Sequence, residues 1–162
     1  MIGNDVVDLQ LAKIESNWRR IGFVDKIFTK NEQIFLFLSE NIEISIWNLW
    51  SRKEAAYKIW NRQTSERKFN PIQFECKNIF GNDVVQFENI IYFTNTQILE
   101  SHIHSIAVTK KSDLNRIKFI SNNIKISKEN NIPFLINKNQ KKEIISKSNH
   151  GKFEFIVGLR NS

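Results

Sequence analysis

The spacing of apolar residues changes at Pro71, and this change constrains the fold more than any other feature of the sequence. Between residues 45 and 62 the apolar side chains recur every three or four positions, as they do on one face of a helix. After Pro71 the period becomes two, because Ile72, Phe74 and Cys76 alternate with polar residues. Helices first and antiparallel strands afterwards predict an α+β fold with a C-terminal meander.

Shorter patterns predict the remaining elements. Residues 2–7 are expected to form a strand, and residues 9–20 a helix that ends before Gly22. A capping box at residues 29–32 predicts a further helix that continues to about Leu38. Later strands are expected near residues 84–93, 102–109, 115–120 and 153–159, and the Asn-, Ser- and Lys-rich residues 121–131 are expected to form a loop.

Length and cysteine content set the class of protein. At 162 residues we expect a single domain, residues 1–162, with a sizeable core. Cys76 is the only cysteine, so no intramolecular disulfide can form, and a packed, inert thiol in a reducing compartment fits. The sequence has no apolar run of membrane-spanning length and no signal-peptide pattern at its start, so we expect a cytoplasmic protein.

The net charge of +7 and the pI near 9.6 favour an anionic partner, although basic charge also aids solubility. Such a partner could be nucleic acid, an acidic protein or a polyphosphate. The basic residues are spread along the chain and are not gathered in one tail. This distribution argues against a disordered nucleic-acid-binding arm.

Glu54 is the most informative single residue. The helical spacing places it on one face with Trp47, Trp50, Tyr57 and Lys58. A carboxylate among large aromatic side chains is costly to desolvate unless a cation or strong donors compensate. Glu54 and Lys58 could instead form an ordinary surface salt bridge four residues apart, but the tryptophans argue against a freely solvated pair.

Asp5 is a second carboxylate without an evident structural role. It could cap the helix that begins at Leu9, yet Asp8 fits that position better. Two isolated carboxylates plus a lysine suit a Mg²⁺ site for a phosphorylated substrate, because Mg²⁺ usually takes one or two protein carboxylates and completes its shell with water and phosphate oxygens. A nuclease site of the D…E-x-K kind fits poorly, since Lys58 lies four residues beyond Glu54 rather than two.

Other polar residues are weaker candidates. Residues 81–85 repeat residues 3–7 letter for letter, but an ordinary hairpin turn explains this repeat, and Asp83 is not expected to bind metal. His102 and His104 share one strand face, yet a zinc site needs three or four ligands, so structural or substrate-lining roles fit better. His150, beside a glycine, could bind phosphate or simply lie in a turn.

Four blocks of sequence together resemble one family. Residues 3–9 are similar to a G-x-D-(I/V)-V-(E/D) strand, and residues 23–32 to F-x-x-(K/R)-(I/V)-(F/L)-T-x-x-E. Residues 53–58 match the most specific signature, K-E-A-x-x-K, and residues 146–151 resemble an S-x-S-H segment. In this order the blocks resemble the 4'-phosphopantetheinyl transferases of the short, holo-acyl-carrier-protein-synthase type.

The resemblance implies transfer of the 4'-phosphopantetheine arm of coenzyme A to a serine of a carrier protein, with release of adenosine 3',5'-bisphosphate. It implies that Asp5 and Glu54 hold Mg²⁺, that Lys58 stabilises charge on the diphosphate, and that the serine proton passes to a water on the ion or to a carboxylate such as Glu54. Coenzyme contacts would come from Ser148, Asn149 and His150, and His150 is favoured over Asn149 because an imidazole suits a phosphate better than an amide does. The acidic carrier would dock on Arg19 and Arg20 at the end of the first helix. A homotrimer is possible, and the sequence does not distinguish fatty-acid, polyketide and peptide biosynthesis.

Two positions depart from the family pattern. Asn149 stands where the S-x-S-H histidine is usual, with His150 following it, and Asn4 replaces an apolar residue in the first block. Asn4 is expected to matter little, because its side chain should point away from Asp5 on a strand. The change at Asn149 keeps an alternative open: a non-catalytic basic module that binds carrier protein or nucleic acid.

Overall fold

The computed structural model describes residues 1–130, 132–137 and 140–160 and contains two antiparallel sheets in these residues. The first sheet has the order β1 (Ile2–Asp8), β5 (His102–Val108), β4 (Ile90–Ile98), β3 (Asn82–Phe87) and β2 (Glu75–Ile79). The second has the order β6 (Ile117–Ile120), β10 (Phe153–Leu159), β9 (Lys142–His150), β8 (Ile132–Ile136) and β7 (Ser127–Glu129). The α+β class predicted from the sequence is confirmed.

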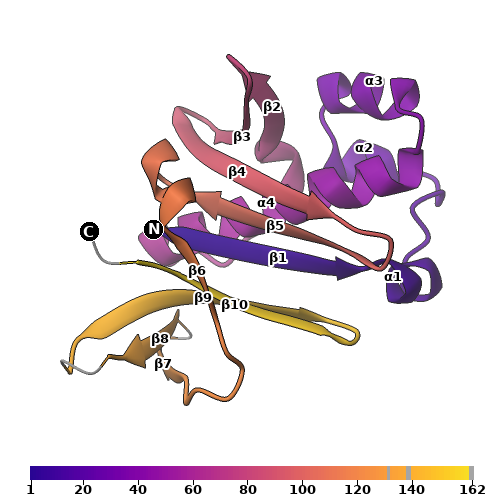
Figure 1. Ribbon diagram of the computed structural model, residues 1–162. Coiled ribbons are helices and arrows are strands. Elements are labelled where there is room, and N and C mark those ends of the chain that lie inside the picture. Colours follow the sequence, from indigo (N-terminus) through magenta and orange to yellow (C-terminus); the bar gives the residue numbers. More distant parts are fainter. Residues whose placement is uncertain (131, 138–139, 161–162) are drawn as a thin grey trace.

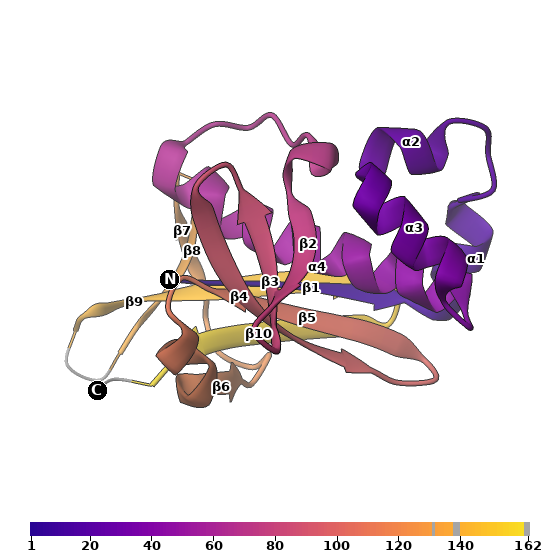
Figure 2. The same ribbon diagram turned by 90° about the horizontal axis from the view of Figure 1, so that it is seen from above.

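Four helices connect β1 to β2. They are α1 (Leu9–Glu15), α2 (Phe23–Ile27), α3 (Lys30–Leu38) and α4 (Ile42–Thr64), and two short 3₁₀ turns follow, η1 (Pro71–Gln73) and η2 (Lys111–Arg116). Figure 1 shows the two sheets one above the other, with α1, α2 and α3 gathered at one end of the molecule. Figure 2 shows the long helix α4 running beside the strands of the first sheet.

Strand β1 is buried on both faces because α4 covers one and the second sheet covers the other. Gly3 lies against the backbone of Ala55 in α4, and Asp5 contacts Lys58 of the same helix. The alternate residues face the other way: Ile2 clusters with Val157 of β10. The two-residue period of a strand therefore assigns one set of β1 side chains to the helix and the other to the second sheet.

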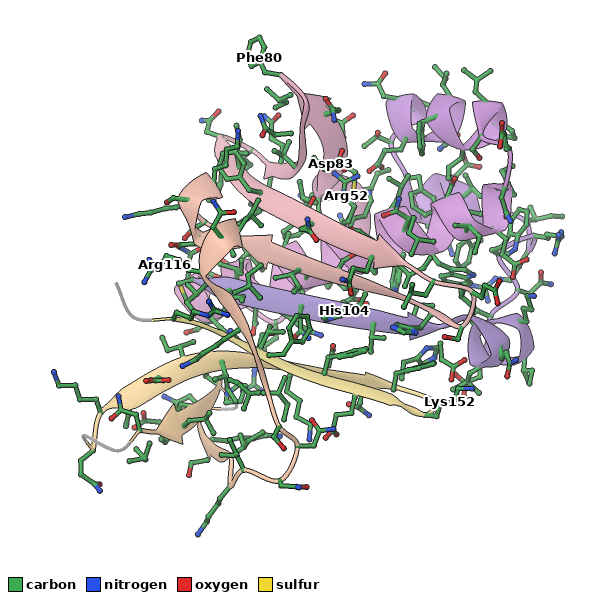
Figure 3. The ribbon with its side chains drawn as sticks, viewed as in Figure 1. Arg52, Phe80, Asp83, His104, Arg116 and Lys152 are labelled. Atoms are coloured by element: carbon green, nitrogen blue, oxygen red, sulfur yellow. The ribbon has the colours of Figure 1, made fainter. Side chains whose placement is uncertain are left out.

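Aromatic stacking fills the space between the sheets. His104 of β5 stacks on Phe155 of β10 with ring centroids 4.3 Å apart, and His102 packs against Phe153 at 4.2 Å. Figure 3 shows His104 directed toward the second sheet. Burial lowers the pKa of His104 to about 4, with smaller contributions from His102 and Lys58. The two histidines are thus neutral packing residues, one of the roles expected from the sequence.

Element boundaries differ from the predictions where short polar side chains bond the backbone. The first helix ends at Glu15 and not at residue 20, because the Asn17 side chain accepts a hydrogen bond from the backbone N–H of Arg19 and forms a turn. Arg19 and Arg20 therefore lie in a turn beyond the helix. At the other end, the Asn41 side chain caps α4 and starts it three residues earlier than predicted.

The strand-rich half contains more strands than the pattern indicated. The segment 84–93 is divided into β3 and β4 by a turn at Glu88, which has a positive φ of 51°. The expected loop at 121–131 includes β7, and its residue 131 lies outside the described residues. Strands β8 and β9 carried no predicted assignment. Within the described ranges, no helix is both long and apolar enough to cross a membrane.

A buried ion pair holds α3, α4 and β2 together. Lys53 is fully buried, and its ammonium donates to Glu32 at 2.7 Å and to the carbonyls of Ile27 and Pro71 at 2.9 and 3.0 Å. The Glu32 carboxylate also accepts hydrogen bonds from the backbone N–H groups of Thr29 and Cys76. The first residue of the K-E-A signature is therefore a structural lysine whose three donors are all satisfied.

Replacing Lys53 by Met should lower the free energy of unfolding by roughly 3–5 kcal/mol, because a buried carboxylate would lose its cation. Urea denaturation measures this loss. Lys77→Met is the matched control, since Lys77 pairs with Glu75 at 2.8 Å in a partly exposed position and should cost less than about 1 kcal/mol. Equal losses in the two variants would contradict a structural role for the buried pair.

Candidate active site

The site is built where β1 crosses α4, and small residues allow the two backbones to approach closely. A Cβ atom added to Gly3 would lie only 2.1 Å from the carbonyl oxygen of Ala55, and Ala55 and Ala56 are fully buried. The hydroxyl of Ser51 lies 2.6 Å from that of Ser105 on β5, which fixes the position of α4 along the sheet. This close contact brings the side chain of β1 at position 5 against the helix.

Asp5, Glu54 and Lys58 meet at this crossing. The Lys58 ammonium lies 3.2 Å from Asp5 Oδ1 and donates to the carbonyl oxygen of Asn4 at 2.7 Å. Glu54 lies one helical turn before Lys58 on α4. The three residues that the sequence singled out are therefore brought together from two elements, more than forty residues apart in the chain.

Asp5 and Glu54 line one pocket of about 330 Å³. Phe23, Trp47 and Trp50 form an aromatic wall, and the backbone of β1 continues the lining through Val6 and Val7. The opposite side comes from the second sheet, where Asn149 and His150 of β9 reach the pocket. The pocket thus combines a carboxylate pair with an apolar wall, an arrangement usual in small-molecule sites.

Both carboxylates are held in an environment that opposes their ionisation. Burial raises the pKa of Asp5, and the neighbouring Lys58 opposes this rise. Burial also raises the pKa of Glu54 to about 7, with a further increase from the charge of Asp5 and a decrease from Lys58. One ammonium therefore does not balance two carboxylates.

This charge imbalance fits a divalent cation. Oxygen ligands from two carboxylates match the preference of Mg²⁺, which needs few protein ligands when a phosphorylated substrate supplies others. The described residues contain no group of three or more His, Cys, Asp or Glu side chains arranged around one point. A site for a metal that requires three or four protein ligands, such as zinc, is therefore not found in them.

Side chains of the S-x-S segment of β9 accept hydrogen bonds from the edge of β1. Ser146 Oγ accepts a hydrogen bond from the backbone N–H of Asn4 at 2.9 Å, and His150 Nδ1 accepts one from that of Asp8 at 2.8 Å. Ser148 Oγ accepts from the Asn4 side-chain amide at 2.9 Å and is buried. Ser146, Ser148 and His150 are thus on one face of β9, while Asn149 belongs to the alternate set and is exposed.

Asn4 contributes more than the sequence suggested. Its side chain does point away from Asp5, as predicted, but it is completely buried between the sheets. The Asn4 amide contacts His104 Nε2 at 3.1 Å and the carbonyl oxygen of Phe155 at 3.2 Å, besides Ser148. The expectation that this position matters little is therefore wrong for the fold, since Asn4 connects three strands.

Arg19 and Arg20 lie outside the carboxylate pocket. Both are exposed, and the Arg19 guanidinium stacks 4.2 Å above the ring of Trp18. Arg19 lines a smaller neighbouring pocket that includes Ser16, and Ser16 also lines the carboxylate pocket. Asp83, excluded as a ligand from the sequence, lies by Arg52 at 3.9 Å, and Figure 3 shows these two residues together at another part of the first sheet.

The raised pKa of Glu54 predicts a pH-dependent stability in metal-free buffer. Below about pH 4.5 Glu54 is protonated in both folded and unfolded states, whereas between 4.5 and about 7 only the unfolded state ionises. Stability should therefore fall as pH rises through this range, by on the order of 3 kcal/mol from Glu54. Denaturation of the wild type and of Glu54→Gln at each pH isolates this contribution, because Asp5 titrates in both proteins. A difference between the two that does not change with pH would contradict the assignment.

Comparisons with known proteins show the family and the fold of the chain. A family model described as the 4'-phosphopantetheinyl transferase superfamily matches residues 1–111, which is more than half of the 162 residues. A comparison with curated proteins gives no match. Among solved structures, the holo-[acyl-carrier-protein] synthase of Helicobacter pylori, in complex with coenzyme A, is similar with a TM-score of 0.54 and 12% identity, over 68% of this chain and 100% of that chain.

Two further structures carry the same fold. The holo-[acyl-carrier-protein] synthase of Neisseria meningitidis has a TM-score of 0.53 and 15% identity, over 68% of this chain and 97% of that chain. That of Thermotoga maritima has a TM-score of 0.52 and 10% identity, and its alignment spans 97% of this chain and 81% of that chain. At these low identities the solved structures show a similar fold alone. The family match covers β1, the four helices and the K-E-A signature. The chain belongs to the 4'-phosphopantetheinyl transferase superfamily.

Proposed function

We propose that this transferase moves the 4'-phosphopantetheine group from coenzyme A to a serine hydroxyl of an acidic acyl or peptidyl carrier protein, in a Mg²⁺-dependent reaction. The observation that carries the proposal is the convergence of Asp5, Glu54 and Lys58 at one pocket, where two carboxylates share a single ammonium. Coenzyme A appears in the Helicobacter pylori structure that shares this fold.

Asp5 and Glu54 are the residues that would hold Mg²⁺. The bound ion would supply a Lewis acid that neutralises charge on the diphosphate of coenzyme A. The raised pKa values of both carboxyl groups support this assignment, because a cation at this position would favour their ionised forms.

The remaining steps use the side chains of the pocket. In the proposed reaction the serine oxygen attacks the phosphorus that bears the pantetheine arm, and the bond from this phosphorus to the bridging oxygen breaks. Lys58 stabilises the charge that develops on the leaving adenosine 3',5'-bisphosphate. The Glu54 carboxylate accepts the proton of the serine as a general base. The aromatic wall excludes water from the reacting groups.

For the coenzyme contacts we assign different roles to the β9 residues. Ser148 is committed to Asn4, and His150 to the backbone of Asp8, so both position β9 beside the site. Asn149 and His150 both line the pocket, but Asn149 is exposed and its amide is the more direct contact for a phosphate oxygen, in place of His150, which was favoured from the sequence. Strands β9 and β1 belong to one chain, and the homotrimer stays an expectation.

Carrier docking on Arg19 and Arg20 is proposed on the basis of charge and position. Both side chains are exposed, and the pocket lined by Arg19 shares Ser16 with the carboxylate pocket. An acidic protein bound there would lie next to the entrance of the site. Electrostatic steering of this kind acts mainly on the rate of association and depends on salt.

Incubation with coenzyme A, Mg²⁺ and an apo acyl carrier protein tests the proposed reaction, with intact-mass analysis of the carrier. A carrier that gains one phosphopantetheine group supports the proposal. Binding of the carrier without any mass gain would instead favour the non-catalytic module.

Glu54→Gln should abolish transfer while the fold is retained, because the amide neither accepts the serine proton nor carries the charge that balances Mg²⁺. Circular dichroism checks the fold, and Mn²⁺ binding followed by electron paramagnetic resonance measures metal affinity separately from turnover. Glu143→Gln, on β9 away from the pocket, is the control for loss of one carboxylate. Turnover of Glu54→Gln at the wild-type rate would end the assignment of Glu54.

Reversing charge at Arg19 and Arg20 to Glu should raise the apparent KM for the carrier and leave that for coenzyme A nearly unchanged. Added salt should weaken wild-type carrier binding in the same direction, through screening over about 8–10 Å. Lys110→Glu with Lys111→Glu makes the same change in net charge at an exposed position elsewhere. If both double variants raised KM equally, net charge and not this surface would guide the carrier.

A further inference from the structure

A second pocket, of about 530 Å³, lies between α3, α4 and β2 and shares no lining residue with the carboxylate pocket. Phe35 of α3, Leu49 of α4 and Ile79 of β2 give it an apolar wall. Arg52 of α4 and Asp83 of β3 add one charge of each sign. We call the cavity lined by these five residues and their neighbours the arginine pocket. Its volume is within the range of about 300–1,000 Å³ that is usual for small-molecule sites.

Neutral oxygen atoms hold the Arg52 guanidinium in place. The residue is only 6% exposed. Its Nε donates to Thr94 Oγ1 at 3.1 Å, and its Nη2 donates to the carbonyl oxygens of Lys77 and Val84 at 3.3 and 2.9 Å. These acceptors orient the cation but do not neutralise it, and a buried charge without a counter-ion is costly.

The third nitrogen of the guanidinium, Nη1, has no hydrogen-bond partner within residues 1–130, 132–137 and 140–160. It is not one of the fully buried polar atoms that lack a partner, so it remains accessible, and the open space that Arg52 borders is the arginine pocket. A guanidinium carries five N–H donors, and the two on Nη1 are therefore open to a ligand in this pocket.

The carboxylates around the arginine pocket leave this cation incompletely balanced. Glu75 and Glu32 are each held by a lysine ammonium, at 2.8 and 2.7 Å. Asp83 Oδ1 lies 3.9 Å from Arg52 Nη2, which is too long for a hydrogen bond, and the Asp83 side chain is 57% exposed. Figure 3 shows Arg52 and Asp83 beside each other. An anion in the pocket could therefore bond Nη1 directly, without displacing a hydrogen-bonded carboxylate.

We infer that the arginine pocket binds a small carboxylate with an apolar body, such as a medium-chain fatty acid. The carboxylate accepts charge-assisted hydrogen bonds from Arg52 Nη1, and the aliphatic chain packs along the apolar wall. Phe35 is half-exposed, and the ligand covers part of its ring. This binding is separate from the proposed transfer, because positions 52 and 54 lie about 200° apart around α4.

Calorimetric titration of the protein with octanoate tests the inference, with 1-octanol and acetate as ligands that each retain one half of its chemistry. Octanoate should bind saturably and about tenfold or more tighter than either control, because only octanoate uses both the cation and the apolar wall. Equal affinity for 1-octanol, or no saturable binding of octanoate at millimolar concentration, would overturn the inference.

Phe35→Ser should weaken octanoate binding several-fold, because it removes part of the apolar wall at a side chain that is already half-exposed. Phe37→Ser is the matched control, since it makes the same change on the same helix at an exposed side chain that does not line the pocket. Equal weakening in both variants would place the ligand on the exposed face of α3 and not in the pocket.

Charge variants test the contact with Arg52. Asp83→Asn should strengthen octanoate binding by roughly threefold, since it removes a like charge beside the bound carboxylate. Glu88→Gln removes the same charge from an exposed turn and should leave the affinity unchanged. Arg52→Gln should reduce the affinity to that of 1-octanol, and circular dichroism checks its fold. If this buried replacement does not fold, Asp83→Asn decides, because an affinity that is unchanged or weaker in that variant contradicts an anchor at Arg52.

Discussion

The structure depends on how the free edge of β1 is satisfied. One edge of this strand pairs with β5 through a regular antiparallel ladder, while the other meets β9 without such a ladder. The backbone N–H groups of Asn4 and Asp8 are instead bonded by Ser146 Oγ and His150 Nδ1. Buried backbone donors need partners, and here polar side chains at alternate positions of a neighbouring strand provide them. The two sheets are joined through these contacts and through the Asn4 amide.

This arrangement explains why one strand can both pack in the core and present a carboxylate to the candidate site. The face of β1 that carries Gly3 and Asp5 is pressed against α4, and its opposite face is fixed by the second sheet. Asp5 is consequently held close to Glu54 by the packing of β1 against α4, and it contacts Lys58 directly at 3.2 Å. Burial in this position raises the pKa values of the two carboxyl groups, and a bound cation would favour their ionised forms.

The adjacent residues Lys53 and Glu54 have separate roles, Lys53 in core packing and Glu54 in the candidate site. Lys53 turns into the core and completes a satisfied ion pair with Glu32, whereas Glu54 lines the pocket with an incompletely balanced charge. Periodicity predicted α4, and the aromatic neighbours of Glu54 singled it out as a candidate functional carboxylate. Nothing local to Lys53 indicated that its partner would be Glu32, because that contact depends on how α3 packs.

Asn4 was undervalued for a similar reason, since its partners on β5, β9 and β10 lie far along the chain. Strands β7 and β8 were also missed, because their sequences have no recognisable alternation.

The side-chain connection between β1 and β9 also determines how this protein tolerates insertions and deletions. Ser146, Ser148 and His150 meet β1 only because they occupy the same face of a strand. A deletion that shifted β9 by one residue would turn these three away and present Lys147 and Asn149 to the buried edge, so that two backbone donors would lose their acceptors together. A shift of two residues would keep the alternation of faces along β9, but different side chains would then meet β1. Length variation in this family should therefore be absorbed in the connections outside β9, and the strand itself should behave as a fixed-register element during divergence.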